Sequence, residues 1–407
     1  MCAGFLLLGF FFKAQCLSPW DGRQYSRLCY NDIQPLFGIR FIAQNVFPYV
    51  DGSMQGTSEL TGGAIEYPVL TGVFMWFAGL FVGDNNNSYL IVSAVLMAPF
   101  GLFTAYLLGK MSGQRALLWA AAPAVILYAF HNWDLLVVAA AVAGFYAWYR
   151  GKALNAAVWF GVGAALKMYP LFFLGPLVLE QWLKGDRRAA LQSAGAGVGA
   201  VALINLPFAV VNRAGWFATY EFHRLRGPNF DNIWTWLPDW MPDLDFSAIN
   251  LWSAALTLIS FALALGFGWM RGVKEEKRYP FLQTCAALLA IFLLWNKVHS
   301  PQYTLWLLPF FVLVRVHMAW WVAYAIVDLV VYVGVFRFFF DQNSAFWRQT
   351  MVGGVWARAL LLAILTFTFL RSPAALDAPE GAGVRAKLPD PKGDAERSAA
   401  LEPASAR

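Results

Sequence analysis

The chain has 407 residues, of which 59% are hydrophobic and 13% charged, and its mean hydropathy is +0.52. Soluble globular domains carry about a quarter charged residues, so this composition excludes an ordinary water-soluble domain and indicates a polytopic membrane protein. The formal net charge of +6 belongs largely to short basic turns and the C-terminal tail, so it calls for no nucleic-acid partner.

The first apolar run, residues 1–15, is short for a membrane span. We expect a retained first helix, because no clear small-x-small cleavage site precedes the polar stretch; a cleaved signal peptide is the alternative. Residues 16–68 are then a long first extracytoplasmic loop that carries interfacial helices. In this loop Cys16 and Cys29 lie on the side where oxidising chemistry joins thiols, and we expect a disulfide between them.

The segment 68–83 conflicts with a simple alternation of crossings. If both this segment and residues 90–109 crossed the membrane, the basic turn that follows them would face outward. The segment begins at Pro68 and is shorter than the roughly 20 residues that a span requires. We therefore predict that it is re-entrant or interfacial.

Basic turns give the topology of the remaining chain, because lysine and arginine concentrate in short cytoplasmic loops. Such turns lie at residues 110–115, 150–152, 184–188, 271–278 and 315–317. The connections between them, including the long loop 212–248, are expected outside. We predict an all-α, polytopic membrane domain over residues 1–371, with about 12 transmembrane helices and both termini in the cytoplasm. Residues 372–407, rich in alanine, proline, glycine and charge, are predicted to be a disordered cytoplasmic tail.

Acids, bases and histidines gather in the connections expected outside. They include Asp32, Arg40, Glu66, His131, Asp134, Lys167, Lys297 and His299. Because polar groups at this depth are unfavourable without a use, the clustering indicates a site at the outer membrane boundary. A transporter would carry its site near the midplane with a polar path to the cytoplasmic side, so the pattern favours an enzyme.

This mixture of side chains suits glycosyl transfer from a lipid phosphate. A carboxylate can take a proton from an attacking hydroxyl, and cations can stabilise a departing phosphate. Trp234 and Trp236, in "NIWTWLPDWMP" (232–242), are candidates to stack on sugar, although an aromatic belt at the membrane surface is the alternative. The sequence has no metal-ligand spacing, P-loop or GxGxxG, so we expect neither a metal nor another cofactor.

Five segments together resemble the actinobacterial branch of glycosyltransferase family 87, over about residues 1–370. They are "CYNDIQPLF", "EYPVLTG", "HNWDLL", "AALKMYPLFFLGPL" and "NKVHSPQYTLWLLP". This resemblance implies a GT-C-like fold and an inverting mannosyltransferase that uses a polyprenyl-phosphate donor and a glycolipid or glycan acceptor. It places the enzyme in the plasma membrane among membrane lipids, with its site on the extracytoplasmic face. A lipid-linked sugar transporter or flippase and a glycan polymer ligase are the alternatives.

The same resemblance implies roles for individual residues. Asp32, in "YNDI", matches the family's catalytic base, and His299 joins it as a catalytic candidate. The candidates for binding the donor phosphate are Lys297, Arg40, Lys167, Gln302 and Tyr303. The candidates for binding the rest of the substrates are Glu66, Asp134, His131, Trp234 and Trp236.

Structural roles remain open for several of these residues. Asp32 could cap a short helix or pair with Arg40, and Lys167 and Lys297 could extend to lipid headgroups. Glu66 and Asp134 could each fix a helix end. Separately, Asp328 and Arg358 lie deep in the last two predicted helices, and we expect them to pair because either charge alone would be unfavourable in lipid.

Overall fold

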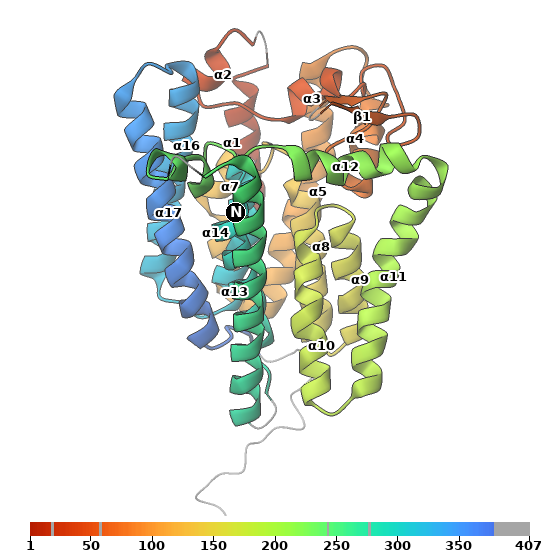
Figure 1. Ribbon diagram of the computed structural model, residues 1–407, viewed down its shortest axis with the longest axis vertical. Helices are drawn as coiled ribbons and strands as arrows, with labels where there is room; N and C mark the ends of the chain where they lie inside the picture. The colour runs from red at the N-terminus through yellow and green to blue at the C-terminus, as the bar shows by residue number, and fades with distance from the viewer. Residues whose placement is uncertain (18–19, 57–58, 242–243, 276–277, 378–407) are drawn as a thin grey trace, which may run out of the picture.

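The computed structural model describes residues 1–377 except 18–19, 57–58, 242–243 and 276–277 (Figure 1). The described chain is mostly helical, with a small antiparallel sheet of two strands. The α-helices are α1 (Cys2–Ala14), α2 (Arg23–Ser26), α3 (Ile33–Ile39), α4 (Val69–Gly79), α5 (Asn86–Ser112), α6 (Leu117–Ala120), α7 (Pro123–Tyr128), α8 (Asp134–Tyr149), α9 (Ala153–Ala164), α10 (Leu174–Leu183), α11 (Arg187–Val211), α12 (Arg213–Leu225), α13 (Phe246–Lys274), α14 (Phe281–Trp295), α15 (Thr304–Leu313), α16 (Met318–Phe340) and α17 (Ala345–Arg371). The 3₁₀ helices are η1 (Gly113–Ala116), η2 (Tyr169–Phe173), η3 (Ile233–Thr235), η4 (Leu237–Asp239) and η5 (Pro301–Tyr303), and the strands are β1 (Ser53–Gln55) and β2 (Glu59–Thr61).

Five helical segments of the described chain are long and apolar enough to cross a membrane. They are Asn86–Ala120, Arg187–Val211, Phe246–Lys274, Met318–Phe340 and Ala345–Arg371. The large apolar side chains that α11 and α13 expose, such as Leu203 and Leu263, suit contact with lipid rather than water. The structure therefore agrees with a helical membrane protein.

The sequence predicted about 12 crossings, but the remaining apolar helices are shorter than the roughly 20 residues of a complete span. Helices α1, α4, α8, α9 and α14 have 11 to 16 residues. Prolines divide several apolar runs, because proline lacks the N–H that continues a helix: Pro123 begins α7, Pro170 lies in η2 and Pro301 begins η5. Helix α4, in the segment expected not to cross, has only 11 residues.

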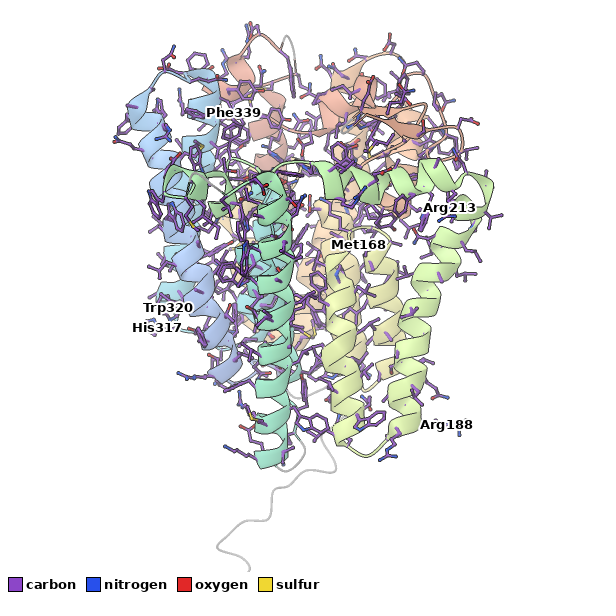
Figure 2. The ribbon with its side chains drawn as sticks, viewed as in Figure 1. Met168, Arg188, Arg213, His317, Trp320 and Phe339 are labelled. Atoms are coloured by element: carbon purple, nitrogen blue, oxygen red, sulfur yellow. A yellow bond between two sulfur atoms is a disulfide. The ribbon has the colours of Figure 1, made fainter. Side chains whose placement is uncertain are left out.

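The basic turns predicted to share one side of the membrane do lie at one end of the molecule. Figure 2 shows Arg188 and His317 at the lower end, and Arg213 and Phe339 at the opposite end of α11 and α16. The Arg115 guanidinium donates hydrogen bonds to the carbonyl groups of Phe311, Val312 and Val314. This places the turn after α5 against the end of α15.

The packed chain continues to Asp377, six residues beyond the predicted domain end at Arg371. The Ala375 amide donates to Leu313 O at 2.8 Å, and the Asp377 amide donates to Met111 O at 2.8 Å. Residues 372–377 therefore do not form part of a disordered tail, because backbone hydrogen bonds fix them between α5 and α15. The rest of the predicted tail, 378–407, lies outside the described residues.

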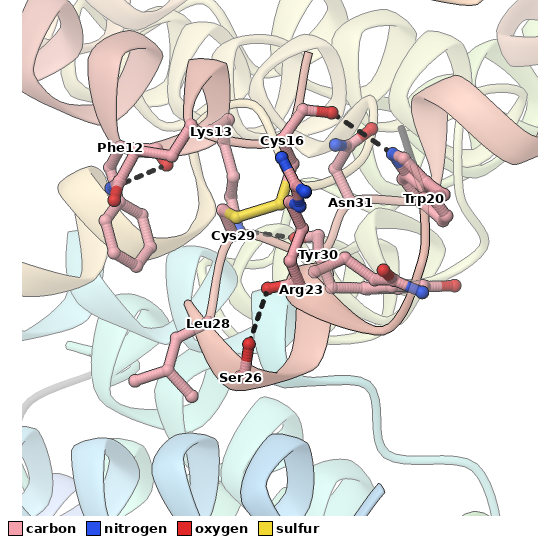
Figure 3. Close-up of a disulfide and its surroundings, with 12 residues drawn as sticks. Phe12, Lys13, Cys16, Trp20, Arg23, Ser26, Leu28, Cys29, Tyr30 and Asn31 are labelled. Carbon is pink, nitrogen blue, oxygen red and sulfur yellow. Dashed lines mark hydrogen bonds between the residues drawn. A yellow bond between two sulfur atoms is a disulfide. The ribbon is translucent and has the colours of Figure 1, made fainter. Parts of the chain in front are cut away.

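The opposite end carries the first long loop, with the short helices α2 and α3 and the sheet, and α12 lies across the bundle below them (Figure 1). The predicted disulfide between Cys16 and Cys29 is confirmed, and it joins the end of α1 to the segment that leads into α3 (Figure 3). Both cysteines are fully buried. The disulfide thus fixes the position of Cys29, which lies three residues before Asp32.

The expected pair between Asp328 and Arg358 is also confirmed. Arg358 Nη1 on α17 lies 3.7 Å from Asp328 Oδ1 on α16, and both side chains are 2% exposed. Asp328 also accepts hydrogen bonds from the hydroxyls of Tyr128, at 2.8 Å, and Thr304, at 2.6 Å. These hydroxyls supply the additional partners that a buried carboxylate requires.

Replacing both Cys16 and Cys29 with alanine should lower the free energy of unfolding by about 3 kcal/mol, because the disulfide closes a loop with a sequence separation of 13. Denaturant unfolding in detergent measures this change. Reduction of the wild-type protein should give a similar loss, whereas an unchanged midpoint after either treatment would contradict a stabilising disulfide.

Candidate functional site

A cleft of about 540 Å³ opens at the end of the bundle that carries the first loop. Its walls come from α3, from the end of α12 and the following loop, from η5 and from the last turns of α16. Polar and charged residues that line it include Asp32, Glu66, His131, Lys167, His223, Arg226, Asp231 and Gln302. The tertiary structure thus brings together Asp32 and Gln302, which are 270 residues apart in sequence.

Asp32 lies at the N-terminal end of α3, yet its side chain makes no capping hydrogen bond. One carboxylate oxygen, Oδ2, accepts a hydrogen bond from Asn132 Nδ2 at 2.8 Å. Burial raises the pKa of Asp32, whereas the hydrogen bond from Asn132 lowers it. Asp32 is therefore a partly buried carboxylate that lines the cleft, and Asn132 holds one of its oxygens.

Asn132 connects the acidic and basic parts of the site, and the sequence analysis did not single it out. Its Nδ2 donates to Asp32 Oδ2 and to the Tyr67 hydroxyl, at 2.8 and 2.6 Å. Its Oδ1 accepts from Lys167 Nζ at 3.2 Å and from the Trp133 amide at 2.6 Å. These partners fix which end of the amide faces Asp32. Its place inside "HNWD", between two polar candidates, was the available signal.

Lys167 and Asp134 form a buried ion pair behind Asp32. Lys167 Nζ lies 2.8 and 2.9 Å from the two carboxylate oxygens of Asp134, which also accepts a hydrogen bond from Trp306 Nε1 at 2.6 Å. The ammonium group lies over the rings of Tyr67, Tyr303 and Trp306 as well. Lys167 therefore points into the site rather than to lipid headgroups. Asp134, fully buried, holds Lys167 and does not line the cleft.

Arg40 pairs with Glu66 rather than with Asp32. Arg40 Nε and Nη2 lie 2.5 and 3.1 Å from the two carboxylate oxygens, a bidentate contact that leaves both side chains 11% exposed. Glu66 lines the cleft, whereas Arg40 lies behind it. Arg40 is therefore placed to orient the Glu66 carboxylate rather than to contact a phosphate.

His223 joins α12 to the same segment. Its Nε2 lies 2.7 Å from Glu66 O, and because a carbonyl only accepts, Nε2 carries the proton in this contact. Burial, together with the nearby charge of Arg226, lowers the pKa of His223 to about 4. His223 is therefore neutral near pH 7 and lines the cleft with Arg226.

Lys297 is held at the C-terminal end of α12. Its Nζ donates to the carbonyls of Arg224 and Arg226, at 2.9 and 2.8 Å, and to Asn250 Oδ1 at 2.5 Å. A cation is favourable at a helix C-terminus, where the last carbonyls lack helical partners. Burial lowers the pKa of Lys297 to about 8. Lys297 fixes α12 to the loop after α14 and does not extend toward headgroups.

The other residues of "NKVHSPQY" separate into two groups. Gln302 and Tyr303 line the cleft, and the Tyr303 ring stacks on Trp306 with 3.7 Å between the ring centroids. His299, predicted as catalytic, is 2% exposed and lies behind the cleft wall rather than on its surface. The four residues from Ser300 to Tyr303 all line the cleft, whereas His299 lines a small cavity behind its wall.

His131 lines the cleft and contacts Lys13, a fully buried residue that the sequence analysis did not identify. Lys13 Nζ lies 3.2 Å from His131 Nδ1 and donates to Tyr30 O at 2.7 Å and to the Tyr332 hydroxyl at 3.0 Å. Figure 3 shows Lys13 extending to Tyr30 beside the disulfide. A lysine near the end of a short apolar helix gave no sequence signal for an inward orientation.

Trp234 and Trp236 do not line the cleft. Their indole nitrogens donate to Trp295 O and Phe230 O, at 2.7 and 2.8 Å, and the two side chains are 3% and 6% exposed. They pack in a buried apolar cluster with Val331 and Val355. Their role in this structure is packing of the loop that precedes α13, rather than a platform for a sugar.

A second cavity of about 290 Å³ adjoins the cleft. The two share Glu66, Tyr67, Lys167, His223 and Tyr303 as a common wall. This cavity leads past Phe292, Asn296 and Lys297 into a groove along α13 that is lined by Phe172, Leu258 and Phe261. The arrangement therefore joins a polar cleft to an apolar groove on the lipid-facing side of the bundle.

Comparison with known proteins gives no family for this chain: no protein-family model and no curated protein matches it.

Replacing Lys167 with methionine should lower the free energy of unfolding by about 3–5 kcal/mol, because Asp134 would keep a buried charge without a cationic partner. Thermal unfolding in detergent measures the loss. The double variant Lys167→Met with Asp134→Asn should recover part of it. The matched control Lys184→Met removes a half-exposed lysine paired with Glu180 and should change stability by about 1 kcal/mol or less. Equal losses in both lysine variants would contradict the importance of the buried pair.

Proposed function

We propose that this protein is an integral membrane glycosyltransferase. It is an inverting mannosyltransferase that moves a sugar from a polyprenyl-phosphate donor to a lipid or cell-wall glycan acceptor. In this proposal the fold is GT-C-like with about 12 crossings, including shorter and divided helices. The cleft faces the extracytoplasmic side of the plasma membrane, and the end with the basic turns, which includes Arg188, faces the cytoplasm.

The observation that carries the proposal is the state of the Asp32 carboxylate. It lines a cleft large enough for a sugar, makes no helix-capping bond, and receives a hydrogen bond from Asn132 on one oxygen. A carboxylate in this position can accept a proton from an acceptor hydroxyl. The motifs that resemble glycosyltransferase family 87 supply the reaction class.

The electrostatics of the cleft support a phosphate leaving group. Arg226 lines the cleft, and its guanidinium donates to Asn229 Oδ1 at 3.3 Å. Lys167 adds a second positive charge at the wall between the cleft and the second cavity, although Asp134 balances part of this charge. Arg226 is the better candidate to contact phosphate oxygens, because arginine presents a planar fork to them.

The apolar groove along α13 suits a polyprenyl chain. It begins beside Lys297 and runs outward along the lipid-facing surface, where exposed leucines such as Leu258 lie. A lipid-linked donor can therefore keep its polyprenyl chain in the apolar groove while its headgroup lies in the second cavity. This path supports a donor that arrives from the membrane rather than a nucleotide sugar from water.

The proposed reaction is a single displacement. Asp32 accepts the proton of the acceptor hydroxyl as the hydroxyl oxygen forms a bond to the anomeric carbon of the sugar. The bond between that carbon and the phosphate oxygen breaks, and its electron pair stays on the phosphate. Arg226 stabilises the added negative charge, and the configuration at the anomeric carbon inverts.

The change Asp32→Asn should reduce sugar transfer at least about 100-fold, because an amide cannot accept the hydroxyl proton. Purified protein in lipid, radiolabelled polyprenyl-phosphate mannose and a lipid extract as acceptor provide the assay. The control Asp51→Asn alters an exposed carboxylate of the same loop and should keep transfer within about twofold. Undiminished transfer by Asp32→Asn would remove Asp32 from its role. No transfer by folded wild type would favour a transporter or another donor.

Transfer should fall on the acid side at a higher pH than an ordinary aspartate would give. The base acts when deprotonated, and burial raises the pKa of Asp32, so the active fraction decreases as the pH falls through that raised value. Replacing Asn132 with leucine removes a hydrogen bond that stabilises the charged form. The acid limb should therefore move to still higher pH, and a pH–rate profile of both proteins measures the shift. A shift to lower pH would contradict this assignment.

A further inference from the structure

A small cavity of about 10 Å³ lies behind the cleft wall, between the loop that precedes η3, the loop that follows α14, and α17. Asp231, His299 and Arg358 line it. A volume of this size is at the lower limit for holding a single water molecule. The other lining residues include the apolar side chains of Leu293, Val355 and Leu362.

Three polar atoms at this cavity lack a hydrogen-bond partner within the described part of the chain. They are Asp231 Oδ2, His299 Nε2 and Arg358 Nη1, each in a residue that is 2–3% exposed. Arg358 Nη1 lies 3.7 Å from Asp328 Oδ1, which is an ion-pair distance but too long for a hydrogen bond. Leaving three such atoms unpaired in a buried site would be strongly unfavourable.

The hydrogen-bonding capacity of each atom can be assigned. His299 Nδ1 lies 3.0 Å from Leu293 O, and because the carbonyl can only accept, Nδ1 carries the proton and Nε2 is an acceptor. Arg358 Nη1 is a donor, and its guanidinium also donates through Nη2 to the Asp231 carbonyl. Burial raises the pKa of Asp231 to about 6, and the positive charge of Arg358 acts against that rise. At pH 7 Asp231 Oδ2 is therefore mainly an acceptor.

We propose that this cavity binds one water molecule, which accepts a hydrogen bond from Arg358 Nη1 and donates to His299 Nε2 and Asp231 Oδ2. One donor and two acceptors match the two hydrogens and a lone pair of water. A metal cation would lie against the guanidinium, and an anion would lie against the Asp231 carboxylate, so a neutral ligand with both donor and acceptor capacity fits this site best.

This water connects the buried charges of Arg358 and Asp328 to the cleft, because Asp231 lines the small cavity and the cleft alike. His299 then acts through the water and Asp231, so it is a positioning residue rather than a catalytic one. Asp231 becomes a second oriented carboxylate of the cleft, in addition to Asp32, which can hold an acceptor hydroxyl. This last role rests on the proposed function, whereas the water site does not.

A structure determined by electron cryo-microscopy at a resolution that shows ordered water tests the site directly. In wild type we expect a density peak within about 2.6–3.2 Å of Asp231 Oδ2, His299 Nε2 and Arg358 Nη1. The variant His299→Phe should lose the peak, whereas the control His317→Phe, at an exposed histidine on the other end of the molecule, should keep it. Absence of the peak in wild type overturns the proposal.

The tautomer of His299 gives a second readout that requires no variant structure. Nitrogen-15 NMR of histidine-labelled wild type, with the signal assigned by difference from His299→Phe, should show a protonated Nδ1 and an unprotonated, hydrogen-bonded Nε2. A protonated Nε2 would overturn the assigned direction of the hydrogen bonds. If His299→Phe does not fold, His299→Gln provides the difference spectrum.

Kinetics test the positioning role separately. If transfer is established, His299→Phe should raise the KM for the acceptor about 5- to 10-fold and change kcat by about twofold or less, as expected for loss of one orienting hydrogen bond. A fall in kcat comparable with that of Asp32→Asn would overturn the positioning role. Failure of the transfer assay in wild type would affect only the proposed function, because the density and the tautomer are measured without substrate.

Discussion

The buried ion pair between Lys167 and Asp134 is the interaction on which the cleft depends. It fixes the end of α9 against the start of α8, and through Asn132 it orients the carboxylate of Asp32. In an interior of low dielectric, neither charge is tolerated without the other. The aromatic rings of Tyr67, Tyr303 and Trp306 lie around the ammonium group and contribute their negative faces to it.

The requirement that backbone groups be satisfied inside a membrane explains where the site lies. Helices that are interrupted at depth leave unpaired carbonyls and amides, which are tolerated only where they face protein or a polar cavity. The break after α9 carries Lys167, and the short helix η5 between α14 and α15 carries Gln302 and Tyr303. Lys297 satisfies the last carbonyls of α12, and the Asp32 amide donates to His131 O at 2.8 Å. The cleft is thus built from helix ends that stabilise one another.

Several predictions from the sequence hold at the level of elements and pairs. Helical membrane segments, the disulfide between Cys16 and Cys29, and the pair between Asp328 and Arg358 follow from hydrophobicity, location and the unfavourable energy of a lone charge in lipid. The number of crossings stays a prediction, because an apolar run does not reveal where proline and close packing divide it. The roles of Asp32 and the other cleft residues in transfer stay predictions.

Hydrophobicity and the placement of charge are local properties of the chain, so they were sufficient to indicate a helical membrane protein whose acids and bases gather at one end. Which of those side chains meet depends on the packing of distant segments. Lys297 could not be distinguished from a phosphate ligand until its three carbonyl and amide partners were in place. His299 could not be separated from Gln302 until the fold placed His299 behind the cleft wall and Gln302 on its surface. Lys13 and Asn132 entered the site for the same reason: their significance lies in contacts between segments far apart in sequence, and no local pattern encodes such contacts.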